Sequence, residues 1–435
     1  MTRMYTQGLT TTSGGNVSSK DSEGNVWLTP SGTDKSCISP DEVCFLDTKG
    51  DWNGRLKPTI EWQMHTKIYS VRPDVCGIVH AHSQSLVSYA ISRVLINTQM
   101  SDYLVKYLGN VDQVDYYICG GCKLAENVAK CFGESNNKNA VLLYSHGIIV
   151  TGSSLQTAFQ RFELLERYTE MSLLLLSLSN SFKSQLLCER YTDQSAIILS
   201  NIDYTQYSLI TNSYKSNAEI LLKFLQRSYM KHLISSEALF SSKTIVDDIP
   251  VVIYSKPSSD PGCMTVEDMF MCYISPSSSP SSSLSSYNEQ RIALHQYIYE
   301  HTSIACIYEA SPIAATALFL SGHHLQPMMP ETLLVVGTIQ YIDIPLHSQC
   351  IYTYKDTIIQ YINEGATILY FKGGNTLVLG KSPIQCYDRL EVLENICVSI
   401  INSLVSLSSL RTMTPPEIEE VYTTFGKILI PKETK

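Results

Sequence analysis

Two histidines lie two residues apart in the apolar run Val79-His80-Ala81-His82-Ser83, which has the character of a buried strand. Alternate residues of a strand point to the same face, so His80 and His82 are expected to project together. Two neighbouring imidazoles become a zinc site when a third ligand joins them, and His146 is the candidate. Three histidine ligands leave zinc an open position for water or substrate, so the sequence predicts a catalytic metal site.

An internal repeat organises the chain around these histidines. The segment GSSLQTAFQRFELLE, which begins at Gly152, aligns without gaps with GKSPIQCYDRLEVLE, which begins at Gly380. Upstream, residues 64–69 match 294–299, and 38–45 match 264–271 in pattern. We therefore predict two related domains, at 1–195 and 205–435, with a Ser/Pro-rich loop at 275–288 inside the second.

Short apolar strands alternate with amphipathic helices in the part of the chain that must position the histidines. The pattern predicts helices near 62–70 and 123–131 and strands near 75–82 and 141–144. Such an alternation is typical of an α/β layered domain.

The repeat also distinguishes histidines of different roles. His65 recurs as His295, each four residues before a tyrosine, as expected of a buried, hydrogen-bonded packing residue. The three candidate ligands have no histidine counterparts, since His80, His82 and His146 align with Glu309, Ser311 and Gly374. A metal site predicts this joint loss, because two ligands are of little use without the third. We therefore expect one zinc ion per chain, in the first domain.

Composition limits the classes of function. Charged residues are 17% and apolar residues 44% of the 435, the net charge is -9, and no apolar run approaches the length of a membrane helix. We therefore expect a globular protein that binds neither nucleic acid nor membrane. Residues 1–8 lack the apolar core of a signal peptide, which favours the cytoplasm and reduced cysteines.

One pair of cysteines, in Cys119-Gly120-Gly121-Cys122, has the spacing of a redox or zinc motif. A second pair that would complete a zinc site is missing, and the context does not match thioredoxin-like chemistry. We interpret the two residues as ordinary thiols at the start of the helix near 123–131.

One further acidic residue and two segments of small residues have two interpretations each. Glu61, which precedes His80 by 19 residues, fits an ordinary acidic residue of a first helical turn, or a general acid and base beside zinc. The small-residue segments TSGGNVS, from Thr12, and LTPSGTDK, from Leu28, fit ordinary turns or loops whose N–H groups and hydroxyls enclose a phosphate.

Taken in order, the motifs GGNVS, TPSG, KPTxE, HAHS and SHG resemble the class II zinc aldolase and adducin family over residues 9–170, and more weakly over 215–410. The resemblance implies two tandem three-layer α/β/α sandwiches, each around a mixed, largely antiparallel sheet, with a degenerate second copy. It also implies a zinc-dependent aldolase that cleaves a sugar phosphate similar to fuculose 1-phosphate to dihydroxyacetone phosphate and a short aldehyde.

The same resemblance implies roles for individual residues. His80, His82 and His146 would hold zinc, and Glu61 would transfer the proton. The substrate phosphate would be bound by Gly15, Asn16, Ser31, Gly32 and Thr59. Where the family often has a second hydroxyl beside the phosphate, this chain has Ile60, which suggests weaker phosphate binding or a different substrate.

Two alternatives stay open within the family. One is a pentulose-phosphate 4-epimerase, although that branch usually carries Asp at the position of Glu61. The other is an adducin-like scaffold without metal, which the second domain alone fits well, since Arg291 stands where Glu61 would be and Ser235-Ser236-Glu237 replaces the glycine loop. We expect the second domain to be catalytically silent and the chain to form a homo-oligomer, such as a dimer with four-lobed pseudo-tetrameric symmetry.

Overall fold

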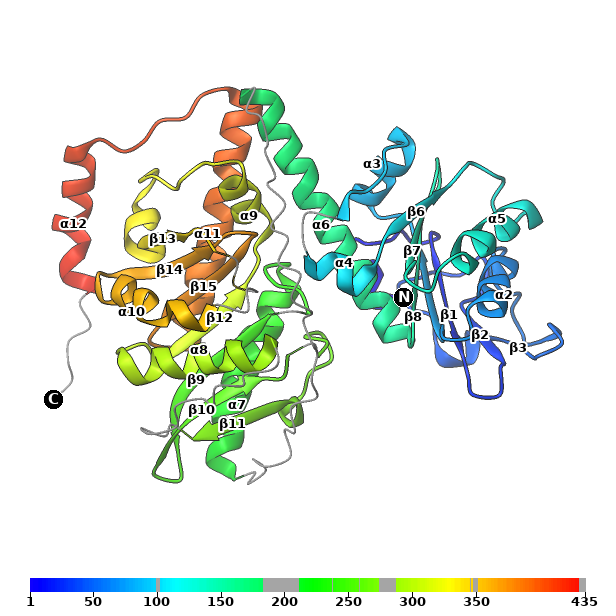
Figure 1. Ribbon diagram of the computed structural model, residues 1–435, viewed down its shortest axis with the longest axis horizontal. Helices are drawn as coiled ribbons and strands as arrows, with labels where there is room; N and C mark the ends of the chain where they lie inside the picture. Colours follow the sequence, from blue (N-terminus) through cyan, green and yellow to red (C-terminus); the bar gives the residue numbers. More distant parts are fainter. Residues whose placement is uncertain are drawn as a thin grey trace. The chain divides into compact units, whose positions relative to one another are not determined.

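The computed structural model describes residues 1–98, 102–182, 211–236, 238–257, 259–273, 287–344, 346 and 351–429. It forms two compact units, the first covering Met1–Leu173 and the second beginning at Leu174. The division falls within helix α6 (Leu155–Phe182), whereas the predicted boundary at 195–205 lies outside the described residues. Figure 1 shows in each unit a sheet with helices packed on it.

The described part of the first unit contains one sheet, with the strand order β4-β3-β2-β1-β5-β8-β7-β6. Adjacent strands of this sheet are antiparallel, except that β6 and β7 are parallel. Its strands are β1 (Asn16–Lys20), β2 (Val26–Leu28), β3 (Cys44–Leu46), β4 (Trp52–Asn53), β5 (Gly77–Ala81), β6 (Val111–Val114), β7 (Ala140–Leu143) and β8 (Gly147–Gly152). The helices are α1 (Thr2–Thr6), η1 (Pro40–Glu42), α2 (Trp62–Val71), α3 (Gln84–Ser92), α4 (Asp102–Leu108), α5 (Cys122–Gly133) and α6.

Helices cover both faces of this sheet. On one face α2 and α5 pack in a core cluster that includes Ile78 of β5, and on the other α3, α4 and α6 pack in a cluster that includes Val79. Successive residues of β5 therefore point to opposite helical layers, as the pleat of a strand requires. The alternation places His80 on the same face as Ile78, toward α2.

The described part of the second unit contains a second sheet, with the strand order β11-β10-β9-β12-β15-β14-β13. Its strands β13 and β14 are parallel, and the other adjacent strands are antiparallel. Its strands are β9 (Leu239–Val246), β10 (Ile249–Ser255), β11 (Met269–Tyr273), β12 (Cys306–Ala310), β13 (Thr338–Ile342), β14 (Ala366–Phe371) and β15 (Asn375–Gly380). The longer helices are α7 (Asn212–Met230), α8 (Tyr287–His301), α9 (Ile313–Leu320), α10 (Lys355–Asn363), α11 (Pro383–Asn402) and α12 (Pro415–Leu429). Short helical turns are η4 (Val266–Asp268), η5 (Thr332–Val336), η6 (Ile351–Tyr354) and η7 (Ser403–Leu407).

Again helices lie on both faces, α8 and α10 on one and α7, α9 and α11 on the other. The expected α/β/α sandwich with a mixed, largely antiparallel sheet is confirmed in both units. Helix α8 begins at Tyr287, so the last two residues of the predicted Ser/Pro-rich loop are helical, and residues 275–286 lie outside the described residues.

The aligned segments of the repeat make the same contacts in the two units. The guanidinium of Arg161 donates to the carbonyls of Tyr107 and Thr151, and that of Arg389 donates to the carbonyls of Val335 and Leu379. In parallel, Glu166 accepts backbone N–H groups at the start of α3, and Glu394 does the same at the start of α9. Buried hydrogen bonds to backbone groups explain why these residues recur.

Helix α11 with its continuation, Pro383–Leu407, is long and apolar enough to cross a membrane by length and composition. However, Leu390, Leu393 and Cys397 are fully buried in the core of the second unit, where the helix packs with α7 and α9. We therefore interpret α11 as a core helix.

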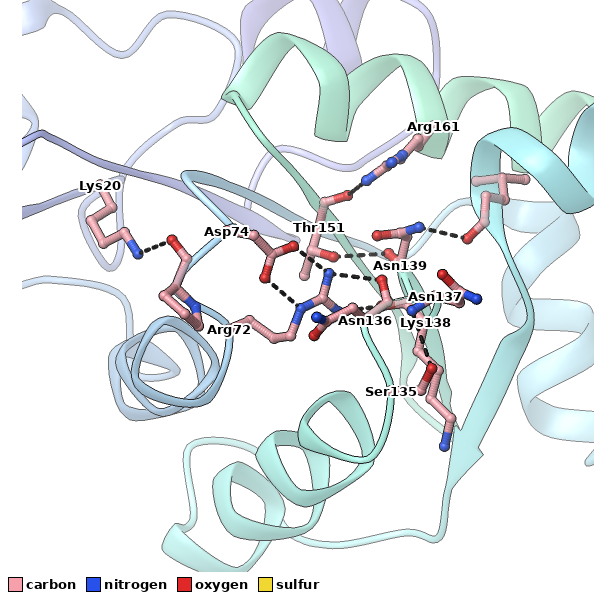
Figure 2. A network of polar contacts seen from close by, with 12 residues as sticks. Lys20, Arg72, Asp74, Ser135, Asn136, Asn137, Lys138, Asn139, Thr151 and Arg161 are labelled. Carbon is pink, nitrogen blue, oxygen red and sulfur yellow. Dashed lines mark hydrogen bonds and ion pairs between the residues drawn. The ribbon is translucent and has the colours of Figure 1, made fainter. Parts of the chain in front are cut away.

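A buried arginine ties the end of α2 to the turn before β7 (Figure 2). The Arg72 side chain is 2% exposed, and its Nε and Nη2 donate to the Asp74 carboxylate at 2.8 and 2.7 Å. Its Nη1 and Nη2 also donate to the carbonyls of Lys138 and Asn136, at 2.7 and 3.1 Å. The contacts tie the segment that leads into β5, which carries His80, to the segment that leads into β7.

Replacement Arg72→Ala is expected to lower the free energy of unfolding of the first unit by about 2–4 kcal/mol, because buried carbonyls lose their donors. The three tryptophans, Trp27, Trp52 and Trp62, all lie in the first unit, so their fluorescence during urea unfolding follows this unit.

The matched control is Lys67→Ala, which removes an exposed ion pair with Glu126 on the neighbouring helix. This change is expected to alter the free energy of unfolding by less than about 0.5 kcal/mol. Equal losses in the two variants would contradict a structural role for Arg72.

Candidate metal centre

Three histidines converge on the face of the first sheet that α2 covers. His80 lies in β5, His82 follows directly after it, and His146 lies in the turn between β7 and β8. The Nε2 atoms of His80 and His82 are 3.0 Å apart, and a ligand nitrogen from each of the three residues lies within 4.8 Å of the others. The structure thus brings the three predicted ligands together.

The backbone of β8 fixes how His80 presents its ring. Its Nδ1 lies 2.8 Å from the carbonyl oxygen of Ile148, which can only accept, so Nδ1 carries the proton. Nε2 is then the ring nitrogen that faces His82 and Glu61. A carbonyl partner of this kind orients metal-binding histidines in known sites.

Glu61, the residue before α2, points its carboxylate at this cluster. The side chain is 6% exposed, with Oε2 3.1 Å from His80 Nε2 and Oε1 3.4 Å from His146 Nε2. Asn16 Nδ2 donates to Oε2 at 2.8 Å, while Oε1 is buried and accepts no hydrogen bond. Glu61 is therefore not the solvated residue of a first helical turn.

A chain of buried hydrogen bonds holds Glu61 from behind. Asn16 Oδ1 lies 2.6 Å from His65 Nε2, which must donate because the amide oxygen can only accept. His65 Nδ1 then accepts from Ser18 Oγ at 2.7 Å, and Ser18 Oγ accepts from the Tyr69 hydroxyl at 2.8 Å. The prediction that His65 is a buried, hydrogen-bonded residue is confirmed, and its partner Asn16 connects it to Glu61.

Burial and mutual charge decide the protonation of these groups. Burial, together with the charge of His80, lowers the pKa of His82 and of His146 to about 4. Burial raises the pKa of Glu61, but the charge and hydrogen bond of His80 outweigh it, so the carboxyl pKa lies well below its usual range. Glu61 in turn raises the pKa of His80 against the effect of burial. At neutral pH the site therefore offers a carboxylate and at least two neutral imidazoles.

The donor atoms fit a divalent metal such as zinc. Nitrogen and oxygen ligands at zinc bond lengths of about 2.0–2.2 Å in a tetrahedron lie about 3.3–3.6 Å apart. The donor pairs His80–His82, His80–Glu61 and His146–Glu61 are 3.0, 3.1 and 3.4 Å apart, near that spacing. His80, His82 and His146 would hold the ion, and the orphaned Oε1 of Glu61 would face it.

The predicted phosphate loops lie next to this centre. Ser31 N donates to the Lys57 carbonyl at 2.8 Å, and Thr59 N donates to the Thr29 carbonyl at 3.1 Å, so the loop of Ser31 and Gly32 runs beside Thr59. At Gly15, where φ is +67°, a Cβ would lie 2.7 Å from the His80 carbonyl oxygen, so glycine permits this close approach. The Asn16 side chain is engaged by Glu61 and His65.

Cys119 lies next to the cluster, a position that the sequence analysis did not predict when it interpreted this residue as an ordinary thiol. Its Sγ lies 3.2 Å from His146 Nε2, and it forms a second possible metal-binding group with Glu61 and His146. Cys122, at the start of α5, contacts Gln63 instead. The C-x-x-C spacing was the available signal, but it does not reveal that one thiol reaches a distant histidine.

In the second unit an ion pair occupies the equivalent position. Superposition of the strand registers places Glu309 at the position of His80, and Arg291 lies where Glu61 would be. Arg291 Nε donates to Glu309 Oε2 at 2.8 Å, and both side chains are at most 3% exposed. Among the residues that the structure describes, the groups of possible metal ligands all lie in the first unit.

Comparison with known proteins also divides the chain into two segments, one in each unit. The family model described as "Class II Aldolase and Adducin N-terminal domain" matches residues 1–173 and 243–400. L-fuculose phosphate aldolase of Methanococcus maripaludis is 30% identical over 40% of this chain and 93% of its own length. The 5-methylthioribulose-1-phosphate/5-deoxyribulose-1-phosphate aldolase of Rhodospirillum rubrum is 32% identical over 38% of this chain and 75% of its own. A 3-oxo-tetronate 4-phosphate decarboxylase of Pectobacterium atrosepticum is 31% identical over 39% and 79%.

The buried neutral state of His65 predicts a pH dependence of stability. Burial lowers the His65 pKa from 6.5 to about 3, so between these values the unfolded chain binds a proton that the folded chain does not. This contribution to stability is complete above pH 6.5 and is lost as the pH falls. His65→Gln should therefore reduce the slope of unfolding free energy against pH by up to about 1.4 kcal/mol per pH unit between about pH 5.5 and 4.

Urea unfolding of the metal-free protein, followed by tryptophan fluorescence at several pH values, measures this slope. The difference in slope is informative even if His65→Gln lowers stability at every pH. An identical slope in the wild type and the variant would show that His65 is protonated in the folded protein.

Proposed function

The chain belongs to the class II aldolase and adducin family, and on that premise we propose that it is a zinc-dependent aldolase of a ketose phosphate. The proposed substrate is similar to fuculose 1-phosphate, and the products are dihydroxyacetone phosphate and a short aldehyde. The observation that carries the proposal is the buried Glu61 carboxylate, which faces three histidines with one oxygen that accepts no hydrogen bond.

Within this proposal Glu61 transfers the proton. Asn16 holds Oε2 by a hydrogen bond, whereas Oε1 accepts none and can give or take a proton on the side of the cluster. A bound divalent cation would supply Lewis-acid stabilisation of the negative charge that remains on oxygen when a carbon-carbon bond breaks. The hydrogen-bond chain through Asn16 and His65 keeps the carboxylate at a fixed position, which acid-base catalysis requires.

We assign substrate phosphate to three neighbouring segments, the two loops that contain Gly15, Asn16, Ser31 and Gly32 and the segment that contains Thr59. Backbone N–H groups and hydroxyls on small residues suit a phosphate. Ile60 is 61% exposed and offers no hydrogen bond, which favours a substrate that also presents apolar surface there.

The second unit acts in this proposal as a partner without a metal centre, since Arg291 and Glu309 neutralise each other where Glu61 and His80 stand in the first. We also propose that the chain forms a homo-oligomer, because a fused degenerate copy can build a pseudo-tetramer from two chains. Sedimentation equilibrium that gives a monomer at micromolar concentration would contradict this assembly.

A decarboxylase or a 4-epimerase acting on a sugar phosphate is the second candidate. A relative of 31% identity carries the decarboxylase name, and in each of these reactions a bond next to a carbonyl breaks and leaves negative charge. The presence of Glu61, rather than Asp, favours the aldolase over the epimerase. An adducin-like scaffold would need no metal at all.

The experiment that tests the proposal combines metal analysis with a substrate screen on the full chain. We expect about one zinc per chain and aldol cleavage of a phosphorylated deoxyketose or pentulose, which a chelator abolishes and zinc restores. Decarboxylation or epimerisation without cleavage would replace the aldolase by the second candidate. Protein that carries no metal and has no activity would support the scaffold.

Replacement Glu61→Gln is expected to lower kcat by roughly two or more orders of magnitude, because the amide cannot exchange a proton. Metal content should be largely retained, since the three histidines remain. Steady-state kinetics and metal analysis on the same preparation separate the two effects.

The control is Glu126→Gln, an exposed acid on α5, which should leave kcat and metal content unchanged. Wild-type turnover in Glu61→Gln would remove this residue from the mechanism.

A further inference from the structure

Cys119 lies beside His146, one of the three histidines of the metal centre. Its Sγ, His146 Nε2 and a carboxylate oxygen of Glu61 lie within 4.8 Å of one another. A ring nitrogen of His146 also lies within 4.8 Å of the ligand nitrogens of His80 and His82. His146 therefore belongs to both groups, and an ion bound to its Nε2 would have the Cys119 thiol beside it.

The loop that carries Cys119 is packed against the segment that carries Glu61. At Gly120, where φ is +71°, a Cβ would lie 2.9 Å from the carbonyl oxygen of Ile60. The N–H of Gly121 closes the turn by donating to the Ile118 carbonyl at 3.0 Å. Glycine at position 120 thus allows the turn to approach Ile60 closely enough to bring Cys119 next to Glu61 and His146.

The distance between Cys119 and His146 matches coordination to a common ion. Sulfur and nitrogen ligands of tetrahedral zinc lie about 3.5 Å apart, at bond lengths of about 2.3 and 2.0 Å. Cys119 Sγ and His146 Nε2 are 3.2 Å apart, close to that spacing. The adjacent Oε1 of Glu61 is buried without a hydrogen bond, an independent sign that the space between these groups belongs to a ligand.

We propose that Cys119 is a further protein ligand of the metal centre in the substrate-free enzyme, in addition to the three histidines and beside the Glu61 carboxylate. One metal–sulfur bond forms, and the thiol proton is released to water. A thiolate is a softer donor than carboxylate or water and suits zinc and cobalt. The inference rests on the metal centre of the proposed function, but not on which reaction the centre catalyses.

Cobalt(II) bound to the full chain tests this ligand, because a cobalt–thiolate bond produces a charge-transfer absorption that imidazole and carboxylate ligands do not. The wild type should show this band. Cys119→Ser should bind cobalt with the same stoichiometry and lose the band. Cys122→Ser is the matched control, since that thiol is also exposed and contacts Gln63 instead, and it should keep the band.

X-ray absorption of the zinc-loaded proteins gives a second readout, with a sulfur neighbour at about 2.3 Å in the wild type and Cys122→Ser but not in Cys119→Ser. Cobalt binding by the wild type without a thiolate band, or a band that survives in Cys119→Ser, would overturn the inference and leave the histidine centre intact. Failure of the wild type to bind cobalt or zinc would overturn the metal centre itself, and the inference with it.

Discussion

The register of strand β5 within the first sheet is the constraint on which the metal centre depends. Pairing with β1 sets His80 opposite Asn16, and pairing with β8 sets it opposite Ile149. A shift of one residue would turn His80 into the opposite core layer, among the neighbours of Val79. The shift would also remove the hydrogen bond between His80 and the Ile148 carbonyl and place the imidazole among apolar side chains, and this cost opposes it.

A buried carboxylate needs compensation, and the two units provide it in different ways. In the first, Glu61 lies among His80, His146 and the amide of Asn16. In the second, a carboxylate stands on the strand at Glu309, and Arg291 on the helix side compensates it. Removing one member of such a buried pair leaves an unpaired charge, which is strongly destabilising. The site positions of the two units therefore had to change together.

The hydrogen-bond chain behind the site shows the same dependence. The pair of a serine and a tyrosine around His65 recurs around His295, where Ser241 Oγ lies 2.8 Å from the ring and 2.7 Å from the Tyr299 hydroxyl. The residue that corresponds to Asn16 is Leu239, and His295 Nε2 has no hydrogen-bond partner. The second unit has no carboxylate at the start of the helix that must be held in position, and it lacks the hydrogen bond that would connect the histidine to that residue. The hydrogen bonds among histidine, serine and tyrosine remain.

The amino-acid sequence by itself determined the layered fold, because the periodicity of strands and helices is a local pattern. It also determined the repeat and the histidines that converge, because the two copies can be compared with each other and only one of them carries the three ligands. It indicated the packing role of His65, which recurs at His295, for the same reason. The contact of Cys119 with His146, the engagement of Asn16 by Glu61 and the ion pair of Arg291 with Glu309 were decided by the tertiary structure. Each joins segments 18 to 45 residues apart in the chain, where spacing carries no information about distance. Strand pairing and the close packing of glycine turns bring those segments together, and both depend on the completed core.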